Sequence, residues 1–146
     1  MSDRNTELFL FDVYIAILKI EEVANRFERA EDLKHDFMAW DTIIREFEII
    51  GEATNRLIKN GLLDEKSRVV VDFRNLLIHH YFGIDAEEVF DVIKNDLLDY
   101  KNIIIQKIEN IENTLKREIL EEVYEENRHL PFVVNKLNEL IRENKE

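Results

Sequence analysis

Apolar residues recur along this chain at intervals of three and four positions, with charged residues between them. That spacing places the apolar side chains on one face of an α-helix and the charged side chains on the other. It predicts helices over residues 6–29, 37–59, 67–80, 86–127 and 130–143. The polar stretch 28–36 is expected to form a turn that contains at most a short helical segment.

Local signals mark several of these helix ends. Gly61 follows the second helix as a stop signal, and Asp85 with Glu88 resembles the capping box that begins a helix. Pro131 suits the first turn of the last helix but not its interior. Gly51 stands inside the second helix, where glycine costs about 1 kcal/mol relative to alanine. A glycine there most often allows another helix to approach closely.

The composition also favours helices. Only three Gly and one Pro occur among the 146 residues, and 36% of the residues are charged. With 45% hydrophobic residues, the chain is large enough to bury one core. We therefore predict an all-α fold, an antiparallel four-helix bundle with a C-terminal helical extension.

The chain lacks the features of secreted and membrane proteins. It contains no Cys, which excludes disulfides and thiolate metal sites. The apolar stretch 8–20 includes Asp12 and Lys19, so it is too short and too charged to span a bilayer, and it lacks the pattern of a signal peptide. We expect a cytoplasmic protein that does not interact with membranes.

The net charge of −12 limits the kinds of partner. Nucleic-acid-binding proteins usually carry a basic surface, so this charge argues against broad RNA affinity. A local basic cleft is still compatible with it, because exposed charges more than about 10 Å apart are largely screened by salt. The charge predicts weak and selective RNA binding, and it is equally compatible with a basic protein partner.

Residues 74–81 bring together the side chains best suited to phosphate chemistry. Arg74 carries a planar guanidinium that can donate two parallel hydrogen bonds to a phosphate. His79 and His80 have an ordinary pKa near neutrality, so either can accept and return a proton. They stand at the predicted end of a helix, where the dipole favours an imidazolium.

Spacing complicates this interpretation. Arg74 and His79 are five residues apart, which is about 140° around an ideal helix. They share a site if the helix unwinds before His79, or if a second copy of the chain supplies one of them across a two-fold axis. An Arg and a His near a helix end are more often capping or surface groups than catalysts.

Other candidate sites have weaker support. Glu48 and Glu52 share a helix face, but no Glu-x-x-His motif accompanies them, so a solvated face is the better interpretation. His35 and His129 lie in polar stretches typical of a surface. The chain has no phosphate-binding glycine loop, no nucleophile elbow and no His-Glu-x-x-His motif. No metal site and no cofactor is predicted.

The segment 74–85, RNLLIHHYFGID, closely resembles the signature of HepT-type proteins of the HEPN superfamily. That signature is Arg, four residues, His, one residue and Tyr, followed by a turn like Gly-Ile-Asp. Segments 44–53 and 89–98 resemble two further helices of the family, and the three blocks occur in the family's order. The resemblance covers residues 7–108.

The resemblance implies a metal-independent ribonuclease that acts as a homodimer. Arg74 would hold the scissile phosphate, and His79 would act as general base or acid. The 2′-hydroxyl of the RNA would attack the phosphorus and leave a cyclic phosphate. Asn75 could orient the phosphate or RNA. His80 also fits the broader motif, although Tyr81, two places after His79, favours His79.

One departure from the family pattern occurs in the second helix. The family often has Asn after the Arg that corresponds to Arg45, and this chain has Glu46. If that position lines the cleft, Glu46 would make the cleft more acidic and weaken RNA binding.

The resemblance also implies a partner and a form of regulation. HepT-like toxins are paired with a minimal nucleotidyltransferase antitoxin of the MntA type, which would transfer AMP to Tyr81. The alternative is a non-catalytic subunit that presents nucleotide or substrate to that enzyme. A third possibility is a dimeric scaffold extended by its C-terminal helices. We predict a HEPN-like bundle over residues 1–110 and a C-terminal extension over 111–146.

Overall fold

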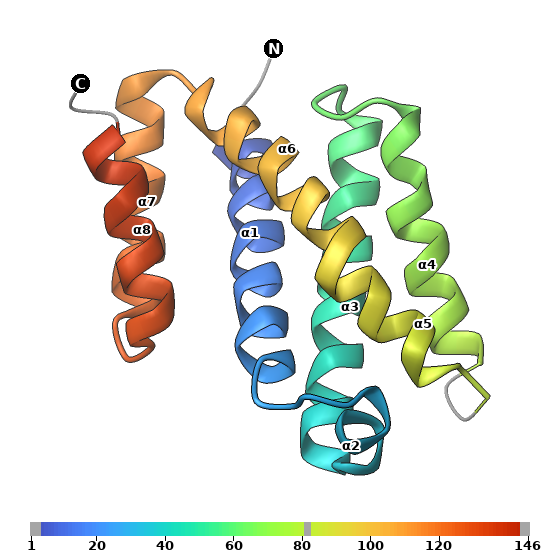
Figure 1. The fold of residues 1–146 in the computed structure, drawn as a ribbon. Coiled ribbons are helices and arrows are strands. Elements are labelled where there is room, and N and C mark those ends of the chain that lie inside the picture. Colours follow the sequence, from blue (N-terminus) through green and yellow to red (C-terminus); the bar gives the residue numbers. More distant parts are fainter. Residues whose placement is uncertain (1–3, 81–82, 144–146) are drawn as a thin grey trace.

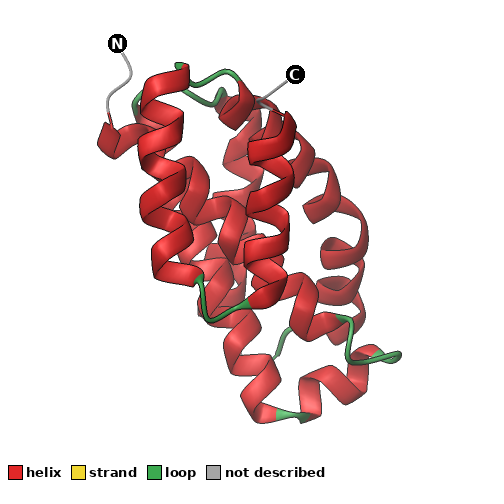
Figure 2. Cartoon of the chain, turned by 90° about the vertical axis from the view of Figure 1, so that its left-hand side faces the viewer, coloured by secondary structure: helices red, strands yellow, loops and turns green. Residues whose placement is uncertain are grey.

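A computed structural model describes residues 4–80 and 83–143 of the chain. In this part of the chain every regular element is helical, as Figure 2 shows. The α-helices are α1 (Arg4–Ala24), α2 (Ala30–His35), α3 (Phe37–Lys59), α4 (Arg68–His79), α5 (Ala86–Asp91), α6 (Leu97–Glu109), α7 (Asn113–Asn127) and α8 (Pro131–Glu143). A 3₁₀ turn, η1 (Glu65–Ser67), leads into α4, and a π-helical segment, η2 (Val92–Asp96), joins α5 to α6.

The main helices form the predicted antiparallel bundle. Helices α1 and α3 pack side by side in the centre, α4 packs on α3, and α6 packs on α1 (Figure 1). The fourth helix of the bundle consists of α5, η2 and α6 together. The short helix α2 contacts α3 and α5 at one end of the bundle. The all-α prediction is therefore confirmed.

The core is built from the apolar faces that the helical spacing predicts. Its members include Ile17 of α1, Ile50 of α3, Leu77 of α4 and Ile104 of α6, each 1% exposed or less. Complete burial of such a side chain contributes about 1.5–3 kcal/mol before the entropy of folding is counted. Packing of these faces therefore determines how the helices are arranged.

A buried hydrogen bond links two helices of the bundle. The hydroxyl groups of Thr54 in α3 and Tyr100 in α6 lie 2.6 Å apart. Burial raises the pKa of Tyr100 to about 12, and the bond to Thr54 opposes that change. The phenol is therefore neutral at physiological pH and holds α3 against α6 without a buried charge.

Two predicted helix ends are wrong. The first helix ends at Ala24 instead of residue 29, because the N–H groups of Arg26 and Phe27 turn back to the carbonyls of Val23 and Ala24. The helix predicted over 86–127 is broken after Glu109. There the Glu112 carboxylate accepts hydrogen bonds from two backbone N–H groups, at 2.9 and 3.0 Å, and begins α7. These bonds lower the pKa of Glu112.

The C-terminal residues form a helical hairpin, α7 and α8, which packs on α1. Pro131 is the first residue of α8, in agreement with the sequence signal. Val133 and Leu137 are fully buried and belong to the same core cluster as residues of α1. The division into residues 1–110 and 111–146 remains a prediction, and the contacts with α1 provide a way to test it.

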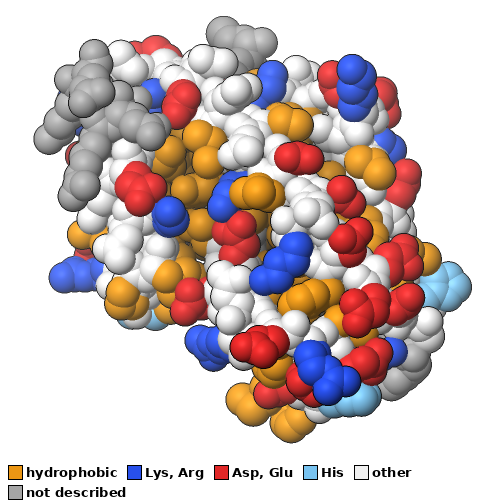
Figure 3. Space-filling view, in the orientation of Figure 1, with side chains coloured by type: hydrophobic (Ala, Val, Ile, Leu, Met, Phe, Trp, Pro, Cys, Tyr) orange, Lys and Arg blue, Asp and Glu red, His pale blue; other side chains and the backbone are white. Residues whose placement is uncertain are grey.

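Charged side chains cover the outer faces of the helices. On the face that Figure 3 shows, acidic side chains are spread among apolar and basic ones instead of forming one patch. Each helix in the described ranges is too short or too polar to cross a lipid bilayer.

Candidate active site

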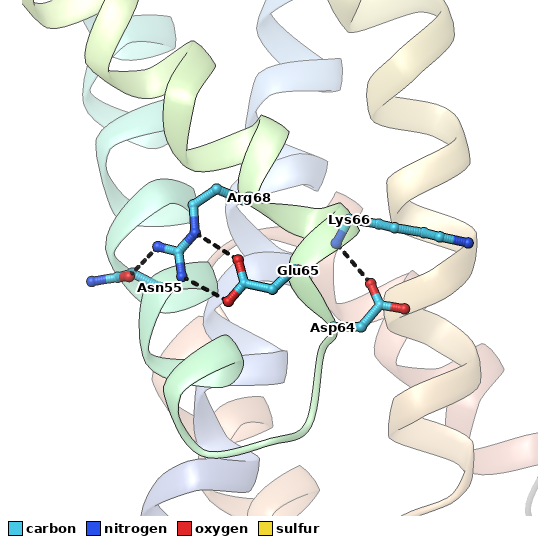
Figure 4. A network of polar contacts seen from close by, with 5 residues as sticks. All are labelled: Asn55, Asp64, Glu65, Lys66 and Arg68. Carbon is cyan, nitrogen blue, oxygen red and sulfur yellow. Dashed lines mark hydrogen bonds and ion pairs between the residues drawn. The ribbon is translucent and has the colours of Figure 1, made fainter.

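Helix α4 carries most of the candidate residues, and polar contacts fix its first turn. Arg68 donates from Nη1 to Asn55 Oδ1 of α3 at 2.8 Å and pairs through Nε with Glu65 at 3.3 Å, as Figure 4 shows. The Asp64 carboxylate accepts the backbone N–H of Lys66 at 2.9 Å, which caps η1. These contacts set the position of α4 along α3.

Arg74 lies where α4 crosses Gly51 of α3. A Cβ atom added to Gly51 would lie only 2.6 Å from Arg74 Cγ and 2.7 Å from Arg74 Cβ. Gly51 is buried and Arg74 is half-buried. The prediction that Gly51 allows a close approach is confirmed, and the group that approaches is the stem of the candidate phosphate-binding residue.

Asn75 orients the guanidinium of Arg74. Arg74 Nε donates a hydrogen bond to Asn75 Oδ1 at 2.8 Å. This bond leaves the two terminal Nη groups, which are the fork that binds a phosphate in bidentate fashion. The structure thus places Asn75 in direct contact with Arg74, and its predicted role toward phosphate or RNA stays a prediction.

His79 and His80 are both exposed at the end of α4. The helix stays regular through His79, and the backbone N–H of His80 still donates to the Leu76 carbonyl at 3.0 Å. Of the two alternatives for a shared site, unwinding of α4 before His79 is therefore not observed. Within one chain, Arg74 and His79 leave α4 about 140° apart, because five residues of a regular helix separate them.

The loop after α4 is held at its far end. Tyr81 lies outside the described residues. Beyond it, the N–H of Gly83 donates to the His80 carbonyl at 2.9 Å, and the Ile84 carbonyl accepts a hydrogen bond from Lys34 Nζ at 2.8 Å. Asp85 caps α5 through the Glu87 N–H at 3.0 Å. Helix α2, which carries Lys34, therefore helps to position the motif loop.

Glu46, the departure from the family pattern in the second helix, is buried. It is 8% exposed, and burial raises the pKa of its carboxyl group, while Lys19 of α1 and Arg45 act in the opposite direction. Glu46 and Gly51 are five residues apart on α3, so they face directions about 140° apart. Whether Glu46 makes an RNA cleft more acidic therefore stays a prediction, and its burial limits how far its carboxyl group is presented to a ligand.

The remaining candidates are surface groups. Glu48 pairs with Arg45 at 3.5 Å, and His35 lies 3.6 Å from Glu31. His129 is exposed. No group of three or more His, Cys, Asp or Glu side chains in residues 4–80 and 83–143 is arranged to hold a metal ion.

Comparison with known proteins assigns the chain to a family. The family described as "Ribonuclease HepT-like" matches residues 14–108, which include α3, α4 and the motif residues 74–81. The chain belongs to this family of the HEPN superfamily. Ribonuclease is the class of activity that this membership supports.

Several relatives match this chain over most of their own length. "Putative RNase MJ1380" of Methanocaldococcus jannaschii is 33% identical over 101 residues, which are 66% of this chain and 91% of the relative. "Putative RNase MJ0127" of the same organism is 30% identical over 112 residues, 71% of this chain and 91% of the relative. "Probable ribonuclease HepT" of Thermococcus cleftensis is 32% identical over 101 residues, which are 67% of this chain and 91% of the relative. No solved structure gave a significant match.

Sequence reasoning did not place Gly51 in the site. Its signal was a glycine inside an otherwise regular helix, which predicts a close approach but not which residue approaches. No sequence signal linked Lys34 to the loop after α4, because a lysine in a polar stretch has many possible hydrogen-bond partners.

Proposed function

We propose that the protein is a metal-independent endoribonuclease toxin that acts as a homodimer. Arg74 holds the scissile phosphate, and His79 transfers protons. The observation that carries this proposal is the fixed orientation of the Arg74 guanidinium. Its Nε donates a hydrogen bond to Asn75 Oδ1 at 2.8 Å. The imidazoles of His79 and His80 are exposed at the C-terminal end of the same helix.

The geometry of α4 supports the proposed dimer. Because Arg74 and His79 leave a regular helix about 140° apart, one chain does not bring both to one phosphate. A two-fold axis beside α4 pairs the Arg74 of one protomer with the His79 of the other. Each cleft then contains groups from both chains.

The reaction requires only proton transfer and charge stabilisation. A neutral imidazole accepts the proton of the RNA 2′-hydroxyl, and the 2′ oxygen attacks the adjacent phosphorus in line. The bond from phosphorus to the 5′ oxygen breaks, and an imidazolium supplies the proton that this oxygen takes up. The products are a 2′,3′-cyclic phosphate and a 5′-hydroxyl end. The guanidinium of Arg74 stabilises the charge on the phosphoryl oxygens.

Purified protein is expected to cleave RNA in excess EDTA and to leave 2′,3′-cyclic phosphate ends. The physical reason is that the nucleophile belongs to the substrate and is activated by imidazole. Gel analysis of a labelled oligonucleotide measures the cleavage, and mass spectrometry identifies the ends. An oligonucleotide with 2′-deoxyribose at the cleaved position is the control and should stay intact. Loss of cleavage on chelation would contradict the mechanism.

We further propose that a minimal nucleotidyltransferase antitoxin of the MntA type regulates the protein by modifying Tyr81. The phenol oxygen attacks the α-phosphorus of ATP, forms a new O–P bond and releases pyrophosphate. The added phosphate brings negative charge to the motif and competes with RNA for the cationic groups of the cleft.

Incubation with that enzyme and ATP should raise the mass of the protein by AMP units and suppress its cleavage of RNA. Intact-mass spectrometry measures the change, and Tyr81→Phe is the control that should stay unmodified and active. Modification that persists in Tyr81→Phe would place the acceptor elsewhere.

The second candidate function is a non-catalytic subunit that presents nucleotide or substrate to the nucleotidyltransferase. The net charge of −12 favours it, since an acidic protein binds RNA weakly. The cleavage assay separates the two functions: this candidate leaves RNA intact but binds the partner enzyme.

A further inference from the structure

We infer that Gly51 is a positioning residue for Arg74: its missing side chain forms the slot in which the Arg74 stem lies. The geometric part stands by itself, and the consequence for catalysis rests on the proposed ribonuclease function. The distances around Gly51 are short, and two contacts, one on each side of Gly51, hold α3 and α4 together.

The slot fits glycine alone. A Cβ at position 51 would come within 2.6 Å of Arg74 Cγ, 2.7 Å of Arg74 Cβ and 3.1 Å of Arg74 Nε. Separations below 3.0 Å between carbon atoms are repulsive, since such atoms are most stable at about 3.5–4.0 Å. The two closest atoms are next to the α4 backbone, so they are less able to swing aside than the tip of the side chain.

The helices themselves resist separation at this point. One turn before Gly51, the rings of Phe47 and Phe73 meet edge to face with centroids 5.2 Å apart. One turn after it, Asn55 accepts the hydrogen bond from Arg68 at 2.8 Å. Because contacts on both sides hold α3 and α4 together, a methyl group at position 51 displaces the Arg74 side chain more readily than the whole of α4.

Displacement of the stem also changes the direction of the charge. In the slot, Arg74 Nε reaches Asn75 Oδ1 at 2.8 Å, and this bond sets the plane of the guanidinium. A different χ1 angle moves Nε away from Asn75 and turns the terminal Nη groups away from their present direction. The positive charge remains, but its bidentate geometry is lost.

Gly51→Ala tests the inference directly. We expect the ¹⁵N–¹H signal of Arg74 Nε, assigned by its absence in Arg74→Lys, to shift and to exchange faster with water. Cleavage of RNA should fall by about 10²-fold, as for other small misplacements of a catalytic group. Lys59→Ala, at an exposed position of the same helix, is the matched control and should change neither readout.

A double-mutant cycle keeps the test informative if Gly51→Ala folds poorly. Arg74→Gly removes both close atoms, so Gly51→Ala in that background should raise the denaturant midpoint of unfolding, because helices favour alanine over glycine. In an Arg74→Ala background the Cβ contact at 2.7 Å remains, so this gain should be smaller or absent.

The outcomes separate the two proposals. An unchanged Arg74 Nε signal in folded Gly51→Ala, or equal effects of Gly51→Ala in all three backgrounds, would overturn the inference. A shifted signal in a protein whose wild type does not cleave RNA would support the slot and refute the ribonuclease.

Discussion

Arg74→Ala and His79→Ala are each expected to reduce RNA cleavage by about 10²–10⁴-fold, the range for loss of a proton-transferring or charge-stabilising group. A mixture of the two variants should regain activity. If both chains build each site, a dimer that contains one variant of each kind has one site with both groups intact. Random exchange of protomers therefore restores about a quarter of the wild-type activity.

The physical reason is the regularity of α4. The helix continues through His79, and the N–H of His80 still donates to Leu76 at 3.0 Å, so no local unwinding turns His79 toward Arg74. Arg74 is held over α3 at Gly51, whereas His79 is exposed. Two groups that point in different directions on one chain favour the proposed site, in which they meet across an interface between two chains.

The measurement uses differently tagged variants that are unfolded, mixed and refolded, with native mass spectrometry to count mixed dimers. Each variant refolded alone is the control and should stay inactive. If mixed dimers form and cleavage stays absent, both groups of a site come from one chain, and the proposed composite cleft is incorrect. Circular dichroism should be the same for all samples. His79 is exposed, Arg74 is half-buried, and neither residue belongs to the hydrophobic core cluster.

Leu137→Ala is expected to lower the free energy of unfolding by about 2–5 kcal/mol, the usual cost of a Leu→Ala change in a core. Leu137 lies in α8, is fully buried and belongs to the core cluster that includes α1. Removing its side chain leaves a cavity between the C-terminal hairpin and the bundle. Chemical denaturation followed by far-ultraviolet circular dichroism measures the change.

Asn135→Ala, at an exposed position of the same helix, is the matched control and should change stability by less than about 0.5 kcal/mol. A single transition that shifts as a whole would show that α7 and α8 unfold together with the bundle. A separate early transition confined to the hairpin would show instead that residues 111–146 form an independent extension.

Much of the helical architecture was predictable from local patterns. The helix over 37–59 is observed with the same ends, α4 differs from its prediction by one residue at each end, and α8 begins at Pro131. These ends follow from residues that act within one turn, such as a capping Asp or a proline in the first turn. The break after Glu109 was missed because Ile111 and Leu115 continue the helical spacing of apolar residues across it.

The candidate residues of the site were also chosen from the sequence, because the types of residue in the motif around Arg74 suit phosphate chemistry wherever they are placed. Their arrangement was not. Whether His79 faces Arg74 depends on whether α4 unwinds, and the spacing of the two residues was compatible with either answer.

The amino-acid sequence by itself thus determined the helices, most of their ends and the candidate phosphate-binding residues. Each of these depends on residues within a few positions of one another. Only the tertiary structure decided that Arg74 lies over Gly51, that Glu46 is buried and that the C-terminal hairpin packs on α1. Gly51 and Arg74 are distant along the chain, and their contact depends on the packing register of α3 on α4. That register results from many side-chain contacts acting together, which no short segment contains.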